Sequence, residues 1–186
     1  MTTGSWSHAL IRDMKLPANQ FMRTEVAVVM RDKYPKAMHH FLVIPWADID
    51  SVYQLSPADI PLLHEMRLLG VNAIETTGKS HDRFRLGFHM KPSMHRLHLH
   101  VISQDFVSDR LRYKEHFNSF VTEFFMPFES TLTGIVLELQ DKGRIERRSQ
   151  ELIEHLLRLP LACNQCAFPC STLPQLKKHL ESHLDS

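Results

Sequence analysis

The stretch MHRLHLHVIS, residues 94–103, alternates polar and apolar side chains along most of its length. Successive side chains of a β-strand point to opposite faces of the sheet. One face of such a strand would carry Leu97, Leu99 and Val101 and would pack on a core. The other face would carry Arg96, His98 and His100. The stretch therefore predicts a strand that buries one face and lines a pocket with imidazole on the other.

Further strands and one long helix are predicted on either side of this stretch. Apolar runs indicate strands at residues 25–32, 39–46, 84–90 and 97–103. Ser56-Pro57 would begin a long helix that ends at Gly78, and a short helix is expected over residues 6–14. Connections of hairpin length favour antiparallel pairing. We expect an α+β fold with a mainly antiparallel sheet and flanking helices.

The second half of the chain changes in character from about Asp105. Residues 105–127 are polar and aromatic and are expected to form loops, whereas residues 128–142 and 149–158 predict two helices. We expect three parts: a sheet domain over 1–106, a packing segment over 107–160, and a small metal-binding unit over 161–186.

Composition limits the class of protein. The 186 residues are 43% hydrophobic and 23% charged, which is typical of a soluble globular chain. No apolar run approaches the roughly 18–20 residues of a membrane span, and we expect no secretory leader and no membrane partner. The net charge of +1 does not itself indicate nucleic acid. Residues 79–114, however, hold eight Lys or Arg against three Asp or Glu, and such a basic rim suits a phosphate-bearing ligand.

The segment CNQCAFPCSTLPQLKKHLESH, residues 163–183, has the ligand spacing of a zinc finger. Two cysteines lie three positions apart, and two histidines follow at positions i and i+4 of a helix; the four are Cys163, Cys166, His179 and His183. Four protein ligands close the coordination sphere, so we predict one structural zinc ion per chain. Leu176 and Cys170 are expected to be buried in the core of the finger.

The two alternating histidines, His98 and His100, allow three interpretations. They could bind a metal ion, with His89 or His40 as a third ligand. They could be satisfied polar side chains of a half-exposed strand. They could also serve nucleophilic catalysis, in which a neutral imidazole attacks phosphorus and forms a phosphohistidine-type intermediate.

The motif HRLHLHVIS, with PSM directly before it, resembles the signature of the histidine triad (HIT) hydrolases and nucleotidyl transferases. The resemblance implies that His98 is the nucleophile that takes the nucleoside monophosphate. It implies that His100 supports phosphate binding and proton handling, and that the Ser93 hydroxyl is directed at the phosphate. Arg96 stands where most members of the family have the first histidine of the triad, and it would face a polyanionic substrate.

Upstream, DKYPKAMHHFLVIPW, residues 32–46, resembles the nucleotide-binding strand–turn–strand of the same family. Asp32 then matches the acid that holds the ribose hydroxyls, and His40 the histidine that packs near the triad. We expect Lys33 and Lys36 to bind the nucleotide, and His89 to help hold the phosphate and the ring.

A HIT domain followed by FNSFVT, residues 117–122, and a finger containing LPQLKKHL resembles one DNA-repair branch of the family. The resemblance implies removal of AMP from 5′-adenylated DNA ends left by abortive ligation, and leaves open whether 3′-guanylate caps are a further substrate. It implies a nuclear monomer that binds nicked duplex DNA, releases AMP and needs no catalytic metal. The expected DNA contacts are Trp6 (which could equally pack in the core), Lys91, Arg96, Lys114 and Asn118.

Three other functions remain open from the residues. A HIT hydrolase could act on a small nucleotide, such as a dinucleoside polyphosphate or an AMP-lysine conjugate. Arg96 in the triad would suit a nick-binding module with a degenerate pocket. A zinc hydrolase would use His98 and His100 as ligands.

Overall fold

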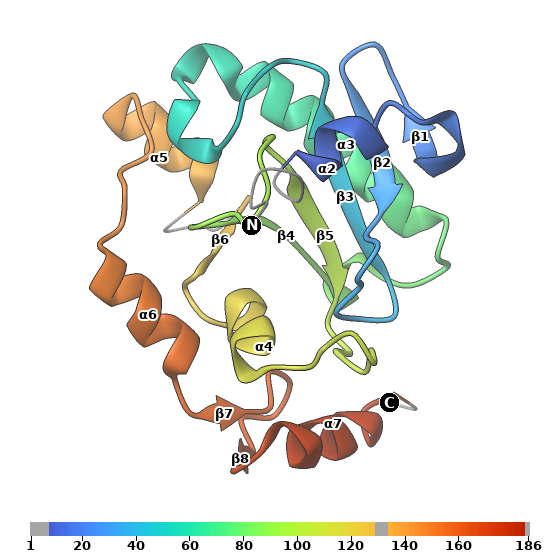
Figure 1. Cartoon of the computed structure of the whole chain (residues 1–186), viewed down its shortest axis with the longest axis vertical. Helices are drawn as coiled ribbons and strands as arrows, with labels where there is room; N and C mark the ends of the chain where they lie inside the picture. The colour runs from blue at the N-terminus through green and yellow to red at the C-terminus, as the bar shows by residue number, and fades with distance from the viewer. Residues whose placement is uncertain (1–7, 129–133, 185–186) are drawn as a thin grey trace, which may run out of the picture.

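One antiparallel sheet organises the protein. The computed structural model describes residues 8–128 and 134–184, and within them six strands pair in the order β1-β2-β3-β5-β4-β6 (Figure 1). The strands are β1 (Gln20–Arg23), β2 (Ala27–Arg31), β3 (His40–Pro45), β4 (Phe84–His89), β5 (Leu99–Ser103) and β6 (Phe125–Pro127). Every neighbouring pair is antiparallel. This confirms the predicted α+β fold.

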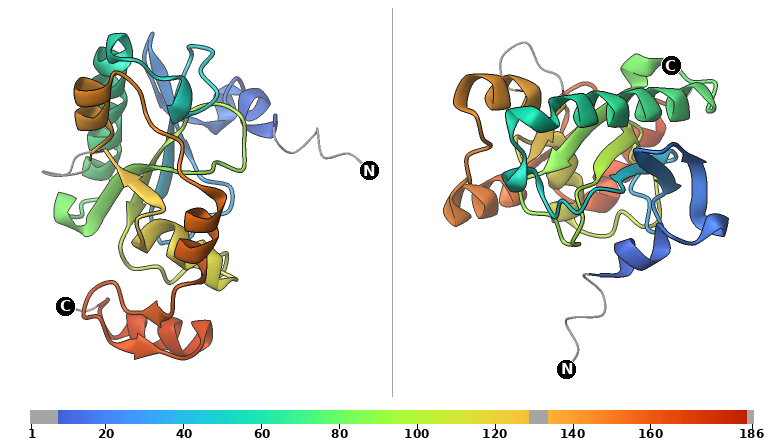
Figure 2. Two further views of the ribbon diagram at one scale, coloured as in Figure 1. Left: turned by 90° about the vertical axis from the view of Figure 1, so that its left-hand side faces the viewer. Right: turned by 90° about the horizontal axis from the view of Figure 1, so that it is seen from above.

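Helices cover both faces of the sheet. The long helix α3 (Ile60–Glu75) lies on one face and the short α2 (Ala9–Asp13) on the other (Figure 2). The remaining helices are α4 (Lys114–Val121), α5 (Ile135–Lys142), α6 (Gln150–Arg158) and α7 (Leu173–Glu181). None of the helices in the described part of the chain has the length and apolar composition to cross a membrane.

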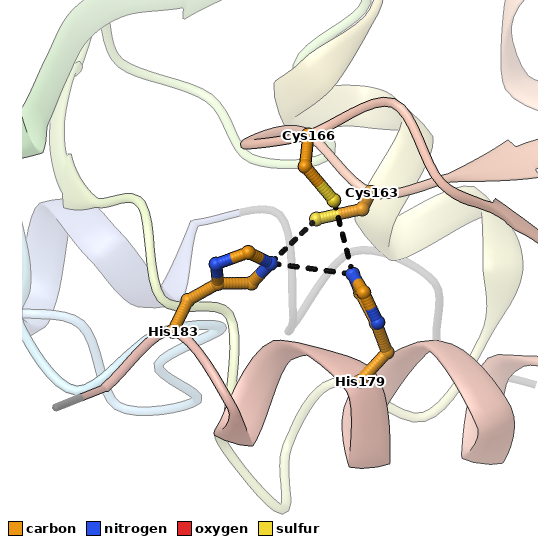
Figure 3. A group of neighbouring side chains, drawn as sticks. All are labelled: Cys163, Cys166, His179 and His183. Carbon is orange, nitrogen blue, oxygen red and sulfur yellow. Dashed lines mark hydrogen bonds between the residues drawn. The ribbon is translucent and has the colours of Figure 1, made fainter. Parts of the chain in front are cut away.

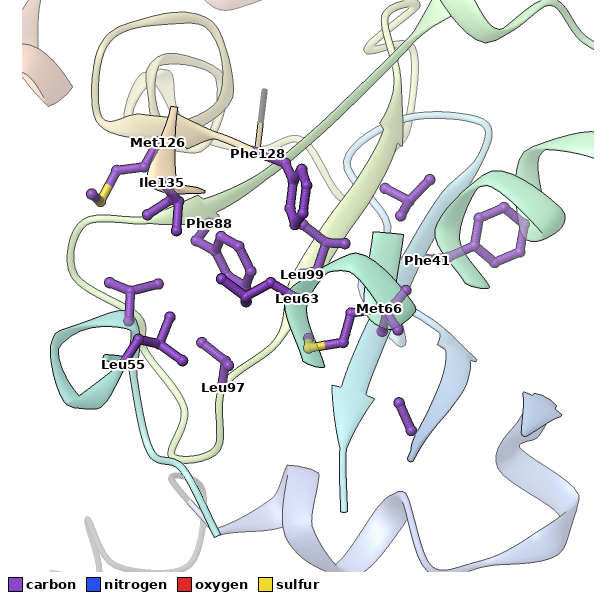
Figure 4. Packing of buried hydrophobic residues seen from close by; sticks show 14 of the residues in the cluster. Phe41, Leu55, Leu63, Met66, Phe88, Leu97, Leu99, Met126, Phe128 and Ile135 are labelled. Carbon is purple, nitrogen blue, oxygen red and sulfur yellow. The ribbon is translucent and has the colours of Figure 1, made fainter. Parts of the chain in front are cut away.

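The main core lies between α3 and the sheet. Leu63 and Met66 of α3 pack with Phe41 and Leu99 of the strands, and all four side chains are fully buried (Figure 4). The helix approaches the sheet so closely at Gly70 that an added Cβ would lie 2.9 Å from Val101 Cγ2. The apolar alternation of β5 is therefore used as predicted, with Leu99 and Val101 facing α3.

The opposite face of the sheet carries two separate apolar clusters. One cluster joins α2 to the strands β2 and β3 and consists mainly of Leu10, Met14, Val28, Met30, Leu42 and Ile44. The other joins the far half of the sheet to α4 and the C-terminal finger, and includes Ile102, Phe106, Phe117, Phe120, Phe125, Leu176 and Leu180.

The finger docks on the sheet domain through α4. It consists of the hairpin β7 (Leu161–Ala162) with β8 (Pro169–Cys170) and the helix α7, and α4 lies between it and the sheet (Figures 1 and 2). Its Lys177 Nζ donates to the Ser108 carbonyl at 3.0 Å, and its Asn164 amide donates to the Gln104 carbonyl at 3.0 Å. The finger therefore packs on the sheet domain and shares its second core.

Several predicted elements differ from the structure. The strand expected over 25–32 is β2, and β1 beside it was not predicted. Residues 105–127, expected as loops, contain α4 and β6. The helix expected over 128–142 begins only at Ile135. Phe128 instead continues the pairing of β6, because its backbone amide donates a hydrogen bond to the Leu86 carbonyl. The helix expected over 149–158 is α6, capped by the Ser149 hydroxyl.

We predict that Gly87→Ala destabilises the protein by about 1–3 kcal/mol, because an added Cβ would lie only 2.6 Å from Phe125 Cε1 and would also press on the β6 backbone. Urea unfolding measures the change. The control is Leu68→Ala at an exposed position of α3, where we expect less than about 0.5 kcal/mol. An equal effect of the two substitutions would contradict the tight β4–β6 packing.

Candidate active site and zinc site

A cavity of about 550 Å³ opens on the sheet face that carries α2 and α4. Side chains of both helices line it, together with the ends of β3, β4 and β5. Its polar lining includes Asp32, Lys33, Lys36, His40, His89, Lys91, Ser93, His98 and His100. The structure thus brings together every residue predicted to be catalytic or nucleotide-binding, and one predicted DNA contact.

Strand pairing places the histidines side by side. His40 is the first residue of β3 and His89 the last of β4, and both strands flank β5. His100 in β5 lies opposite Leu42 on one side and Gly87 on the other. His98 precedes β5 by one residue. Three neighbouring strands therefore direct four imidazole rings into one cavity.

His98 is held in one tautomer by the backbone. Its Nδ1 lies 2.8 Å from the Arg96 carbonyl oxygen. A carbonyl oxygen can only accept, so Nδ1 carries the proton and Nε2 of the neutral ring keeps its lone pair. Within the described residues, Nδ1 is the only ring nitrogen of His98 that has a hydrogen-bond partner. The geometry is that of an imidazole nucleophile.

His40 and His100 form a hydrogen-bond chain. The Lys36 amide donates to His40 Nδ1 at 3.3 Å, so the proton of the neutral His40 ring is on Nε2. His40 Nε2 then donates to His100 Nδ1 at 2.9 Å. The proton of His100 is consequently on Nε2, which is buried without a partner among the described residues. His100 can donate this proton to an oxygen in the cavity.

His89 offers a second unpaired nitrogen beside His100. The two rings lie 4.3 Å apart, and His89 Nε2 is buried with no hydrogen-bond partner in the described part of the chain. A buried polar atom without a partner costs about 1–3 kcal/mol of free energy. Two such atoms side by side indicate a binding site in which a ligand supplies the missing hydrogen-bond partners.

Burial keeps these rings neutral. Desolvation is the main cause that lowers the pKa of each, and for His40 the pKa falls to about 4. For His98 the Arg96 carbonyl and the Asp32 carboxylate oppose this shift by favouring the charged ring. At neutral pH His98 is therefore a neutral base with an available lone pair.

The predicted nucleotide-binding residues lie on the loop after β2. The Asp32 carboxylate accepts from the Tyr34 amide at 2.7 Å, lies 3.6 Å from His40 Nδ1 and is slightly exposed to the cavity. Lys36 is half-buried, donates to the Tyr34 carbonyl, and has its pKa lowered by burial. The lining thus holds a carboxylate that can accept hydrogen bonds from hydroxyl groups, and amines that can bind phosphate.

Arg96 departs from the prediction that it faces the cavity. Its backbone has a φ of 86°, which interrupts the alternation and ends the extended strand before His98. The guanidinium is instead buried against the 47–48 loop, where it donates to the Ala47 carbonyl at 2.6 Å and pairs with Asp48 at 2.9 Å. The Arg96 carbonyl, rather than its side chain, serves the site.

One further predicted DNA contact needs correction. The Asn118 side chain is buried, and its amide donates to the Leu157 and Leu159 carbonyls at 2.9 Å, so that it joins α4 to α6 and does not reach a ligand. Lys114 is half-buried at the start of α4, outside the cavity lining, and its contact with DNA stays a prediction. Trp6 lies outside the described residues.

The predictions missed the contribution of α4 to the cavity. His116, Ser119 and Phe120 line it and recur at helical spacing, and exposed Tyr113 stands at the start of the helix. This periodicity in YKEHFNSF was the available signal. Arg110 and Arg112 also line the cavity, which extends its basic rim.

The four predicted zinc ligands meet in the finger (Figure 3). Cys163 Sγ lies 3.5 Å from His183 Nε2, Cys166 Sγ lies 3.1 Å from His179 Nε2, and the two Nε2 atoms are 3.2 Å apart. Metal–ligand bonds of about 2.0–2.3 Å in a tetrahedron place neighbouring ligand atoms roughly 3.3–3.8 Å apart. Two of the three distances are slightly shorter than this, and all four ligand atoms lie within 4.8 Å of one another, so small adjustments would accommodate one zinc ion.

The core of the finger matches the prediction. Leu176 is fully buried and Cys170 nearly so, in the cluster shared with α4. The Cys170 thiol is separate from the group of four ligand atoms. Phe168 stacks on the ligand His179 with ring centroids 4.8 Å apart.

Comparison with known proteins agrees with these features. Residues 5–116, more than half of the chain, match the family described as scavenger mRNA decapping enzyme C-term binding. Residues 121–186 match the family described as C2HE / C2H2 / C2HC zinc-binding finger.

Curated relatives cover almost the whole chain. An aprataxin-like protein of Drosophila melanogaster is 48% identical over 97% of the chain, and the aprataxin of Gallus gallus is 42% identical over 97%. The chain spans 27% and 55% of the length of these relatives.

A solved structure of similar fold is titled as the aprataxin ortholog Hnt3 in complex with DNA. It covers 97% of this chain and 96% of its own, with a TM-score of 0.69 and 21% identity. The chain therefore belongs to the HIT-like family described as scavenger mRNA decapping enzyme C-term binding, and its homologues over nearly its full length are aprataxins.

Proposed function

We propose that the protein hydrolyses the 5′–5′ pyrophosphate of adenylated DNA ends, releasing AMP and restoring a 5′-phosphate. The main support is His98, a neutral imidazole with its Nε2 lone pair available in a cavity that also holds two unpaired histidine nitrogens. Similarity to aprataxins, and to an ortholog solved with DNA, supports DNA as the substrate class.

In the first step, His98 Nε2 attacks the phosphorus of the AMP group. A nitrogen–phosphorus bond forms, and the bond from that phosphorus to the bridging oxygen breaks, so that DNA leaves with its 5′-phosphate. The Arg96 carbonyl stabilises the positive charge that develops on the ring, because it accepts from Nδ1–H. In the second step, a water oxygen attacks the same phosphorus and the nitrogen–phosphorus bond breaks. AMP leaves, the proton lost by the water passes to solvent, and His98 returns to its neutral form.

The other rings stabilise the negative charge of the transition state. His100 Nε2–H, fixed by the chain from the Lys36 amide through His40, donates to a phosphate oxygen. His89 and Ser93 lie in the same lining and supply further hydrogen bonds. Donors held in place before the reaction contribute because they need no reorganisation.

The nucleotide is held by the loop after β2. The Asp32 carboxylate accepts from the ribose hydroxyls, and Lys33 and Lys36 neutralise phosphate. We propose that zinc serves only the finger, as one ion per chain, because four protein ligands complete its coordination. Asp32, His40 and His100 also lie close enough for a metal, but both ring nitrogens of His40 and Nδ1 of His100 are used by the hydrogen-bond chain.

The remaining expectations follow from the substrate. We propose a nuclear location, a monomer, and binding of nicked duplex DNA; hydrolysis of a small nucleotide is the alternative, since a cavity of about 550 Å³ also suits a free nucleotide. Comparing an adenylated nick with an AMP-lysine conjugate separates the two. A 3′-guanylate-capped nick tests the wider substrate range.

We predict that His98→Ala lowers AMP release from a 5′-adenylated nicked duplex by at least about 10³-fold, because the nucleophile is lost. Release by the wild type should survive brief treatment with EDTA. The control is His64→Ala at an exposed position of α3, which should match the wild type. Nick binding without AMP release by the wild type would refute the proposed function and favour a binding module.

We predict that kcat/KM stays constant as the pH falls through 6.5 and declines only in a more acidic range, because burial lowers the pKa of His98. Asp32→Asn should move this acidic limb to still lower pH, since the Asp32 carboxylate favours protonated His98. A pH–rate profile of both proteins measures the limb. A shift of the acidic limb of Asp32→Asn towards higher pH would contradict the assignment of neutral His98 as the reactive form.

We predict that elemental analysis finds one zinc per chain, and that Cys166→Ala loses it and lowers the melting temperature by roughly 10 °C, as a loss of several kcal/mol implies. Cys170→Ala is the matched control, because this thiol lies outside the ligand group. Zinc loss from Cys170→Ala, or full zinc in Cys166→Ala, would show that the ligand set is different.

A further inference from the structure

A second cavity of about 530 Å³ lies beside the candidate active site. Three segments line it, from the loop before α3, the connection between β4 and β5, and the start of α6; they are residues 50–54, 90–95 and 147–153. The residues at its far side, among them Arg147 and Arg148, take no part in the proposed chemistry.

The two cavities share a wall. Lys91, Ser93 and Met94 line both of them, so this short segment separates the reacting centre from the second cavity. Ser93 is one of the residues proposed to bind the reacting phosphate. A polymer held at Ser93 can therefore pass directly into the second cavity.

The second cavity is basic. Its lining contains Lys91, Arg147 and Arg148 against one carboxylate, Asp50. Arg148 is already neutralised by Glu138 at 2.9 Å and Glu146 at 3.8 Å. Arg147, in contrast, has no carboxylate within 4.0 Å among the described residues.

The Arg147 guanidinium is held in place without an acidic partner. It lies 4.6 Å from the centre of the Tyr53 ring, and the Tyr53 hydroxyl donates to the Met90 carbonyl at 2.5 Å. Lys91 Nζ donates to Gln150 across the cavity at 3.2 Å. Stacking fixes the plane of a guanidinium and leaves its donors available, which suits bidentate binding of phosphate.

We propose that this cavity binds a backbone phosphodiester of the nucleic acid whose 5′-end occupies the active site, with Arg147 as the principal contact. The inference rests on the proposed function, because it extends the same substrate beyond the reacting phosphate. Free phosphate or a second nucleotide carries the same kind of negative charge. Only a polymer, however, would extend past Ser93 and occupy both cavities at once.

The test measures binding of a labelled nicked duplex with a plain 5′-phosphate by fluorescence anisotropy over a range of NaCl concentrations. Arg147→Gln should weaken binding about tenfold, as expected for a charge-assisted contact. The slope of log K against log salt should become shallower by about one, since one fewer phosphate is neutralised. Arg147→Lys should restore the slope and part of the affinity, because it keeps the charge but not the planar donors.

Arg144→Gln is the matched control, because it removes the same charge from an exposed position of the same segment that does not line the cavity. It should retain the affinity and the salt slope of the wild type. Equal effects of the two glutamine substitutions would overturn the proposal. Equal melting temperatures of the variants would confirm that the difference is not one of folding.

Two further measurements separate the possible sources of the anion and the two proposals. If inorganic phosphate at millimolar concentration binds the wild type and Arg147→Gln equally well, while the duplex binds the wild type more tightly, the ligand is the polymer. If only free phosphate binds the wild type more tightly than Arg147→Gln, a backbone site is refuted. AMP release from an adenylated nick is measured in parallel. Its absence in the wild type would refute the proposed function, while the anisotropy result would still decide the role of Arg147.

Discussion

The hydrogen bond between His40 Nε2 and His100 Nδ1 is the interaction on which the site depends. A buried imidazole nitrogen that has no partner costs about 1–3 kcal/mol of free energy, so hydrogen bonds between the rings are favoured. The Lys36 amide must therefore meet His40, which ties the loop after β2 to β5 through two rings. After these bonds are made, the proton of His100 is left on the nitrogen that faces the cavity. The tautomer of the ring and the position of the nucleotide loop are thus set by the same chain of hydrogen bonds.

Phe120 of α4 contacts three of these buried rings. Phe120 lies 4.6 Å from the His89 ring, 5.2 Å from His100 and 5.3 Å from His40. Desolvation by such neighbours is the largest cause of the lowered pKa of each ring. A helix that supplies no nucleophile therefore contributes to the burial that keeps these rings neutral. The proposed chemistry needs neutral rings, so the packing of α4 is a condition for it.

The predictable and the unpredictable parts of the site differ in physical origin. The imidazole face of β5 and the zinc ligands follow from spacing alone, because a strand alternates and a helix repeats at about 3.6 residues. Arg96 could not be placed in this way, since its φ of 86° arises from tertiary contacts with the 47–48 loop. Asn118 was mistaken for a ligand contact because a buried amide between two helices has no local signature. The helix α4 was predictable from its period but was obscured by its many polar residues.

The position of α4 in turn depends on the finger. Phe117 of α4 shares a core with Leu176 and Leu180 of α7, and Asn118 joins α4 to α6 directly before the finger begins. A finger that only contacted nucleic acid could hold its leucines in a core of its own and be connected by a linker. Here its apolar residues complete the core that supports Phe120, which covers the histidines. The packing of the finger therefore supports the helix whose Phe120 covers the imidazoles, although none of its own described residues lines the cavity.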